Sequence, residues 1–518
     1  MSQVAKGVPV QARNVVVVLL DSLNRHLLGA YGGTEFETPN IDRFAARARV
    51  FDRHQVGSLP CMPARHDILC GALDFLWRPW GSIELWEEPI TAALRRAGVT
   101  TMLVSDHPHL FETGGENYHT DFSAWDYVRG HEGDPWKTRA DPSWIGAPAL
   151  PAARGHGHAY DLTRTWFRRE LDFPGPRTMD SAARWLREQG ARTDDGARAP
   201  FLLFVDEFDP HEPFDTPAPW ANRYDPDWQG PLMIWPPYAK RAVERGILSA
   251  REARHLRANY GSKLSMIDHW FGRILDALDE SALWEDTLVI LCTDHGHYLG
   301  ERDLFGKPGV PHFAPLAHIP LMIGGAGVEA GRYDRLTTSV DLHATLCDLF
   351  AVTPTHRTHG VSLLPALVDD AGPVRDWALA GVFGRWVQIT DGHRKYARAP
   401  VSADNLPLSM WSNRWSTMPV RNMPELQLPR PDRRARLDFM PGSEVPVIRQ
   451  PFAPGDPLPF WALGMRPGDH HCYLLDEDPG EVENRAGEAV GLELCDLLHA
   501  ALRSLEAPDE QFRRLGIG

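Results

Sequence analysis

The segment Asn14-Val15-Val16-Val17-Val18-Leu19-Leu20 decides the fold of this chain. It is an unbroken run of β-branched and aliphatic residues of strand length, which is typical of a parallel strand buried on both faces. Polar residues follow at once, beginning with Asp21 and Ser22. The pattern predicts an α/β protein in which a functional group stands at the carboxyl end of a buried strand.

Three later segments repeat this pattern of an apolar strand followed by acids and histidines. They are residues 100–104 with Asp106, His107 and His109, residues 201–205 with Asp206, Glu207, Asp209 and His211, and residues 287–291 with Asp294, His295 and His297. Helical patterns lie between them, over residues 41–48, 90–96, 179–189 and 249–278. Strands alternating with helices indicate a mostly parallel central sheet flanked by helices. Because ligands bind at the carboxyl ends of such strands, four polar strand ends predict a metal or phosphate-type site.

The pattern changes near residue 372. Residues 377–398 are typical of short strands with turns, and a proline-rich stretch and a closing helix over residues 490–505 follow. We therefore predict a catalytic α/β domain over residues 1–371. A smaller α+β domain with antiparallel strands is predicted over residues 372–518. The Pro-, Gly- and Trp-rich residues 129–177 and 214–238 are predicted to be loops over the active-site face.

Composition excludes several classes of function. A net charge of −15 without a basic tract argues against nucleic-acid binding, so an anionic substrate needs a local positive patch. Six sparse, irregularly spaced cysteines do not form a disulfide framework. Residues 1–14 lack the apolar core of a signal peptide, and no apolar run is long enough to span a membrane. We expect a cytoplasmic enzyme that contacts neither membrane nor nucleic acid.

Cys61-Met62-Pro63-Ala64-Arg65 is the second informative stretch, and it begins a short helical pattern. A cysteine at a helix N-terminus meets unpaired N–H groups, and Arg65 adds a positive charge one turn later. This setting suits a group that must become anionic or must bind an anion. A buried structural cysteine beside a proline turn is the alternative, and the motif alone does not decide between them.

Together these motifs resemble the sulfatase family of the alkaline-phosphatase superfamily, near the phosphonate monoester hydrolases. The stretch from Cys61 to Arg65 matches the signature of the family. Further matching blocks run nearly from end to end: Leu20-Asp21-Ser22, Leu28-Gly29-Ala30-Tyr31-Gly32, Thr38-Pro39-Asn40-Ile41-Asp42, Thr293-Asp294-His295-Gly296, Gly306-Lys307 and Tyr473-Leu474-Leu475-Asp476. The resemblance implies an alkaline-phosphatase-like fold.

The resemblance also implies a mechanism. A separate maturation enzyme would oxidise Cys61 to formylglycine, whose hydrate attacks the sulfur or phosphorus of the ester and displaces the alcohol. One divalent metal ion would be held by Asp21, Cys61 in its modified form, Asp294 and His295. Because Ser22 and His295 stand where many relatives have further oxygen ligands, Mn²⁺ is expected beside Ca²⁺, with Zn²⁺ ranked third.

Other site residues follow from the same resemblance. Arg65 would hold the diol, while Lys307 and His211 would stabilise or protonate the leaving oxygen. A surface lysine and a turn histidine are the alternatives for these two. The Lys-x-His of the family is missing, and either His107 or His109 is the candidate that replaces it.

Four functions remain open at this point. The first is a sulfate ester hydrolase, and the second is a phosphonate monoester or phosphodiester hydrolase with the same residues. A binding protein that has lost the chemistry and a cysteine-thiolate hydrolase are the other two. The expected partners are a small sulfate or phosphonate ester and the formylglycine-generating enzyme, and a homo-oligomer is left open.

Overall fold

A central eight-stranded sheet organises the computed structural model, which describes residues 10, 12–143, 157–190, 199–368, 372–415 and 431–518. The strand order is β11-β2-β10-β7-β1-β5-β3-β4, and only β10 runs antiparallel to its neighbours. The strands are β1 (Asn14–Leu20), β2 (Ala48–Gln55), β3 (Thr100–Ser105), β4 (Ala124–Tyr127), β5 (Phe201–Glu207), β7 (Thr287–Cys292), β10 (Leu321–Gly325) and β11 (Gly331–Thr338). The predicted mostly parallel sheet is therefore confirmed.

The four strands predicted from their polar ends are neighbours, in the order β7-β1-β5-β3. Every residue of β1, β5 and β7 is buried, which is why these strands lack the alternation of a half-exposed sheet. Because the four strands are parallel, their acids and histidines emerge at the same edge. This edge carries the site described below.

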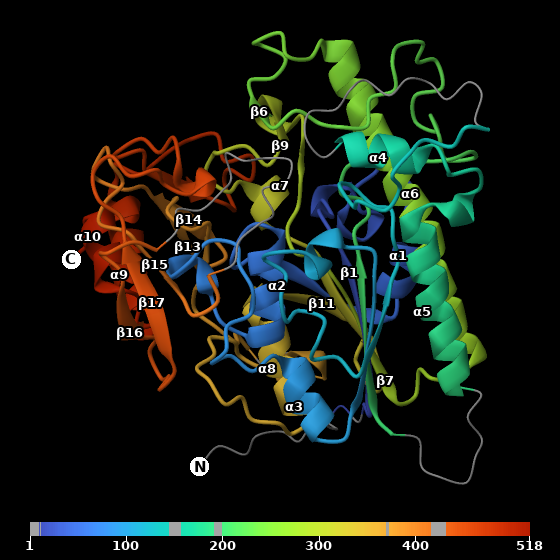
Figure 1. The fold of residues 1–518 in the computed structure, drawn as a ribbon, viewed down its shortest axis with the longest axis horizontal. Helices are drawn as coiled ribbons and strands as arrows, with labels where there is room; N and C mark the ends of the chain where they lie inside the picture. The colour runs from blue at the N-terminus through green and yellow to red at the C-terminus, as the bar shows by residue number, and fades with distance from the viewer. Residues whose placement is uncertain (1–9, 11, 144–156, 191–198, 369–371, 416–430) are drawn as a thin grey trace.

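Helices cover both faces of the sheet (Figure 1). One face packs against α1 (Pro39–Ala45), α5 (Pro174–Gly190) and α6 (Ala250–Glu280), and the other against α2 (Cys61–Cys70), α3 (Ile90–Arg96) and α8 (Val340–Leu349). Alternate residues of β1 divide between the two cores, with Val16 and Val18 on the α6 side and Val15 and Val17 on the α2 side. This is the three-layer arrangement expected for a parallel sheet.

One predicted helix is shorter than expected. The pattern predicted a helix over residues 41–48, but α1 ends at Ala45 and β2 begins at Ala48. The charged residues Arg49, Asp52 and Arg53 hid this strand, since they break its apolar pattern. Pairing with β10 and β11 on either side overrides the local sequence preference.

The C-terminal region contains two antiparallel sheets. The first, ordered β12-β13-β14-β18, consists of β12 (Ala378–Gly381), β13 (Val387–Thr390), β14 (Arg394–Arg398) and β18 (His471–Leu474). The second consists of β15 (Ser409–Ser412), β16 (Arg436–Phe439) and β17 (Pro446–Pro451), and α9 (Ala489–Ser504) and α10 (Asp509–Leu515) close the chain. The predicted strands and closing helix are present, while the boundary at residue 372 stays a prediction.

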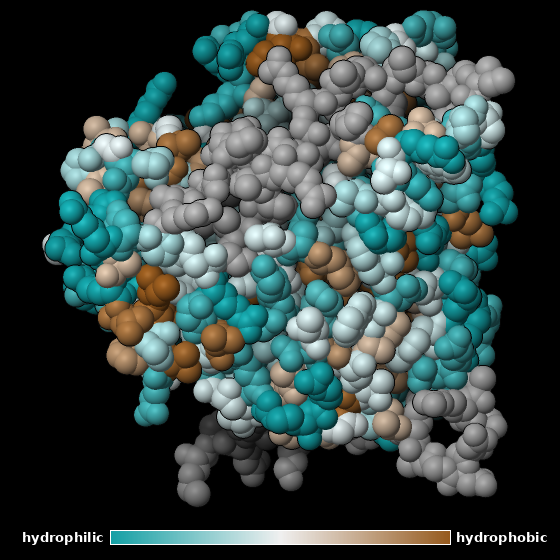
Figure 2. All heavy atoms as spheres, in the orientation of Figure 1, coloured by the Kyte–Doolittle hydropathy of each residue, from teal (hydrophilic) through white to brown (hydrophobic). Residues whose placement is uncertain are grey.

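Shorter elements lie around the active-site edge. They are α4 (Gly157–Arg164), β6 (Ala239–Lys240), β8 (Tyr298–Leu299), β9 (Leu304–Gly306) and α7 (Ala314–Ala317). Within the predicted loop over residues 129–177, residues 144–156 lie outside the described part. Figure 2 shows a mostly hydrophilic surface on the side viewed, with hydrophobic side chains gathered over β16 and β17, where Leu437 and Phe439 are exposed. None of the described helices is long and apolar enough to cross a membrane.

A buried carboxylate on α6 takes the place of a helix cap for α1. The N-cap residue Thr38 makes no side-chain capping bond. Instead, Asp268 accepts hydrogen bonds from the backbone N–H groups of Asn40, at 3.1 Å, and Ile41, at 2.7 Å. These bonds satisfy donors that the helix itself cannot pair.

We expect Asp268→Ala to lower the free energy of unfolding by about 2 kcal/mol, because two buried N–H groups lose their acceptor. Urea unfolding measures the change. Asp276→Ala is the matched control on the same helix, since its carboxylate makes only an exposed ion pair with Arg43. Equal losses in the two variants would contradict the capping role.

Candidate active site

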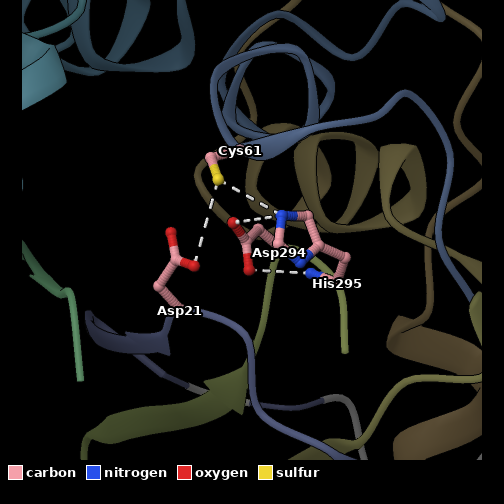
Figure 3. Close-up of side chains that lie close together, drawn as sticks. All are labelled: Asp21, Cys61, Asp294 and His295. Carbon is pink, nitrogen blue, oxygen red and sulfur yellow. Dashed lines mark hydrogen bonds and ion pairs between the residues drawn. The ribbon is translucent and has the colours of Figure 1, made fainter. Parts of the chain in front are cut away.

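Four side chains from three segments meet at the carboxyl edge of the sheet. Asp21 follows β1, Asp294 and His295 follow β7, and Cys61 is the first residue of α2. One donor atom from each lies within 4.8 Å of the other three, and all four residues are buried (Figure 3). Cys61 Sγ is 3.2 Å from His295 Nε2 and 4.0 Å from Asp21 Oδ1. These are the four residues expected to hold a metal ion.

Arg65 connects this cluster to the neighbouring strand. Its guanidinium, which is 1% exposed, binds Asp206 through two hydrogen bonds of 2.8 and 2.6 Å. It also lies 3.0 Å from Asp21 and 2.8 Å from Asp294, and it donates to the Cys61 carbonyl at 3.2 Å. Arg65 is thus the shared counter-charge of three strand-end carboxylates. Asp206 was visible as a strand-end acid in the sequence, but its pairing with Arg65 was not predicted.

Lys307 and His211 form a pair beside Cys61. Lys307 Nζ lies 3.6 Å from Cys61 Sγ and 2.9 Å from His211 Nε2. His211 Nδ1 lies 2.8 Å from the Glu212 carbonyl and donates to it, so Nε2 accepts a hydrogen bond from Lys307. Burial, reinforced by the charge of Lys307, lowers the pKa of His211 to about 3. Burial opposes the charge of Lys307, but Cys61 and Glu212 raise its pKa, so the lysine carries the proton of this pair.

Glu212 is a site residue that the sequence reasoning missed. Its buried carboxylate accepts hydrogen bonds from the Tyr238 hydroxyl and from His297 Nε2, the latter at 3.2 Å. Burial opposes its charge, yet His211 and His297 hold the pKa of Glu212 well below its usual value. Its place directly after His211 in a strand-end motif was the available signal.

His107 and His109 have different surroundings, although both follow β3. His107 Nε2 lies 3.6 Å from Asp21 Oδ2 and makes no hydrogen bond with any described residue, so this nitrogen faces the cluster. His109 instead contacts the carboxylates of Glu112 and Glu132. Burial opposes it, but Glu112 and Glu132 raise the pKa of His109 to about 10. Of the two candidates for the missing Lys-x-His contact, His107 is the one that lies beside Asp21, and the role of each histidine stays a prediction.

The C-terminal region holds the backbone just before Cys61. Leu59 N–H donates to the Gly381 carbonyl at 2.9 Å, and Gly381 N–H donates to the Gly57 carbonyl at 3.1 Å. Gly381 ends β12, so the first C-terminal sheet is joined to the turn from which α2 begins. The position of Cys61 therefore depends on residues more than 300 positions later in the chain.

Comparison with known proteins gives the family. A family model described as Sulfatase matches residues 13–352. The chain belongs to the sulfatase family. This confirms the resemblance drawn from the sequence and classes the protein as a sulfuric ester hydrolase.

The chain is similar to two curated relatives and to one solved structure that are named for different activities. Choline-sulfatase of Rhizobium meliloti (strain 1021) is 27% identical over 425 residues, which cover 76% of this chain and 79% of the relative. The multifunctional alkaline phosphatase superfamily protein PehA of Trinickia caryophylli is 28% identical over 414 residues, covering 70% and 78%. The phosphonate monoester hydrolase of Agrobacterium radiobacter has a TM-score of 0.63 at 21% identity, with 95% of each chain covered, and shares the fold.

The donor set of the sulfatase site fits a divalent metal ion. His295 Nδ1 donates to the Gly296 carbonyl at 2.9 Å, which leaves the lone pair of Nε2 directed into the cluster. Burial lowers the pKa of His295 to about 4, so its ring is neutral near pH 7. Burial and Asp294 raise the pKa of Asp21, because two carboxylates face one another there. A cation would relieve this repulsion, and the choice among Mn²⁺, Ca²⁺ and Zn²⁺ stays a prediction.

We expect Mn²⁺ or Ca²⁺ to raise the melting temperature of protein first treated with a chelator, with a stabilisation of about 3 kcal/mol at a concentration 100 times Kd. Asp294→Asn should remove most of this increase, because a ligand charge is lost. Asp225→Asn is the control, since that carboxylate binds Arg251 and His255 away from the cluster. An undiminished increase in Asp294→Asn would contradict the assignment.

Proposed function

We propose that this protein hydrolyses sulfate esters with a nucleophile derived from Cys61 and one divalent metal ion. The observation that carries the proposal is the convergence of Cys61 with Asp21, Asp294 and His295 at the carboxyl edge of the sheet. Membership in the sulfatase family supports it. The alternative is hydrolysis of phosphonate monoesters or phosphodiesters, which the likeness to PehA and to the phosphonate monoester hydrolase favours.

Cys61 would act after oxidation to formylglycine by a maturation enzyme. The hydrated aldehyde would supply the attacking hydroxyl. Asp21, Asp294 and His295 would hold a divalent metal ion, which would supply Lewis-acid activation of that hydroxyl and of the ester. Cys61 is 4% exposed and lies at the start of α2, so its side chain is held in one direction by the helix. In the thiolate alternative, His295 would be the base, since its Nε2 lies 3.2 Å from Sγ.

The leaving oxygen would meet Lys307. Its ammonium lies beside Cys61 and carries the proton of the Lys307–His211 pair, so it can neutralise or protonate the departing alkoxide. His211 holds the ammonium in place through Nε2. Arg65 fixes the carboxylates that orient the reacting groups, and His107 lies 3.6 Å from the same Asp21 oxygen that Arg65 contacts.

The partners follow from this chemistry. The substrate would be a small sulfate ester, or a phosphonate ester in the alternative, and the maturation enzyme would act on Cys61. We propose a cytoplasmic location, as expected from the sequence.

Co-expression with a formylglycine-generating enzyme should convert Cys61, and the intact mass should fall by the difference between cysteine and formylglycine. The mature protein should hydrolyse aryl sulfates, and Cys61→Ala should lower kcat/KM about a thousandfold or more because the nucleophile is lost. Cys495→Ala is the control, since that thiol lies on α9.

Two outcomes would overturn parts of this proposal. Full activity with an unmodified Cys61 would favour the thiolate alternative. A much higher kcat/KM on a phosphonate monoester than on the paired aryl sulfate would favour the phosphonate alternative.

Lys307→Ala should lower kcat/KM by about 10²–10⁴-fold for alkyl esters with basic leaving groups. The loss should be much smaller for 4-nitrophenyl esters, because nitrophenolate departs without a proton. A plot of log kcat/KM against leaving-group pKa measures the difference as a steeper slope. An unchanged slope would show that Lys307 acts elsewhere than on the leaving oxygen.

A further inference from the structure

A cavity of about 120 Å³ opens directly beside the proposed nucleophile. Pro60, the residue before Cys61, lines one side, and Lys307 lines another. Because Lys307 faces the leaving oxygen in the proposed function, this cavity lies where the alcohol part of the ester would extend. Its other lining residues are drawn from both the catalytic and the C-terminal regions.

Arg385 lines this cavity with an unpaired positive charge. Burial lowers the pKa of Arg385 to about 10, and within the described part of the chain no carboxylate raises it again. Arg385 is half-buried, and no carboxylate of the described residues forms an ion pair with it, although arginine is normally paired when it leaves water. An anionic ligand would supply the missing counter-charge.

His312 is a second unpartnered group in the same cavity. It is 3% exposed, and neither ring nitrogen has a hydrogen-bond partner among the described residues. Its ring is neutral, because burial and the charge of Arg385 lower the pKa of His312 to about 3. A neutral imidazole offers one N–H donor. The cavity therefore presents a cation and a free donor to whatever enters it.

Gly309, two residues after Lys307, packs tightly against the side chain of Arg385. A Cβ atom at Gly309 would lie 2.2 Å from Arg385 Nη1, so only a glycine lets the guanidinium rest there. A neighbouring cavity of about 350 Å³ shares Gly309, and its charged lining residues are three cations, Lys240, Arg302 and Arg466, and one acid, Asp469. Cations thus gather beside this site although the whole chain has a net charge of −15.

We propose that the Arg385–His312 cavity binds a second anionic group on the alcohol part of the substrate. The substrate class is then an ester whose leaving group carries a carboxylate or another oxyanion. Arg385 would donate charge-assisted hydrogen bonds to that group, and His312 would donate its free N–H. This inference rests on the proposed ester hydrolysis and adds the part of the substrate that is selected.

Kinetics on matched substrates tests the cavity. The probes are 4-carboxyphenyl sulfate, its methyl ester, which keeps the sulfate but lacks the second anionic group, and 4-sulfophenyl sulfate. The corresponding phosphonates replace them if those are the esters that the enzyme cleaves. Arg385→Gln should lower kcat/KM about 10- to 100-fold for the two substrates with a second anionic group. It should leave kcat/KM for the methyl ester within about twofold of the wild-type value. The carboxylate and sulfonate arms separate a planar from a tetrahedral anion.

Gly309→Ala and Arg254→Gln are the companion variants. Gly309→Ala should reproduce the selective loss, because the added methyl displaces the guanidinium. Arg254→Gln removes an exposed arginine of α6 and should leave kcat/KM unchanged for substrates with and without the second anionic group. Arg385→Gln would overturn the proposal if it lowered kcat/KM equally for substrates with and without the second anionic group. The same selective loss in Arg254→Gln would also overturn it.

Binding to a Cys61→Ala protein gives a readout independent of hydrolysis. By calorimetry, 4-carboxyphenyl sulfate should bind more tightly than its methyl ester, and Arg385→Gln in this background should abolish the difference. If the mature enzyme hydrolyses none of the esters, the proposed function is refuted. The binding measurement still tests the cavity in that case. Equal affinity for the acid and the methyl ester would overturn the cavity proposal alone.

Discussion

One buried arginine holds the charges of this active site together. Arg65 donates hydrogen bonds to both carboxylate oxygens of Asp206 and also contacts Asp21 and Asp294. Carboxylates at the ends of three adjacent strands therefore share one cation. Without it, three carboxylates would be buried within a few ångströms of one another, and the penalty of an uncompensated buried charge is about 3–5 kcal/mol. Since Arg65 also donates to the Cys61 carbonyl, the charge balance of the site and the position of Cys61 depend on the same side chain.

The parallel sheet explains why such a concentration of charge is found at one place. Strands β7, β1, β5 and β3 point the same way, so each delivers its terminal polar residue to the same edge. Their interiors are apolar and fully buried, which leaves the strand ends as the position where polar groups can be satisfied. His211 follows β5 to this edge, and Lys307, which follows β9 of a small antiparallel sheet, meets it there at 2.9 Å.

Much of this could be predicted from the sequence, because the informative patterns are local. An apolar run followed by an acid identifies a strand and its end together, which is how Asp21 and Asp294 were placed at one edge of the sheet. The resemblance to the sulfatase family added Cys61 and His295, and the structure brings all four residues together. Strand β2 was missed because Arg49, Asp52 and Arg53 break its apolar pattern, and its pairing is decided by neighbours distant in sequence. The pairing of Arg65 with Asp206 and the meeting of His312 with Arg385 depend on three-dimensional proximity, which no local pattern encodes.

The hydrogen bonds between Gly381 and the residues just before Cys61 bear on how the chain can be divided. They tie β12 to the turn that sets the direction of α2, and Val382 and Arg385, just beyond β12, form a wall of the cavity beside Lys307. The C-terminal region is therefore part of the structure that positions Cys61, and the region before it does not form the site alone. Shortening the chain near residue 372, or replacing that region with the one from a relative, would remove the hydrogen bonds that hold the turn before Cys61. It would also change the residues that line the cavity beside Lys307.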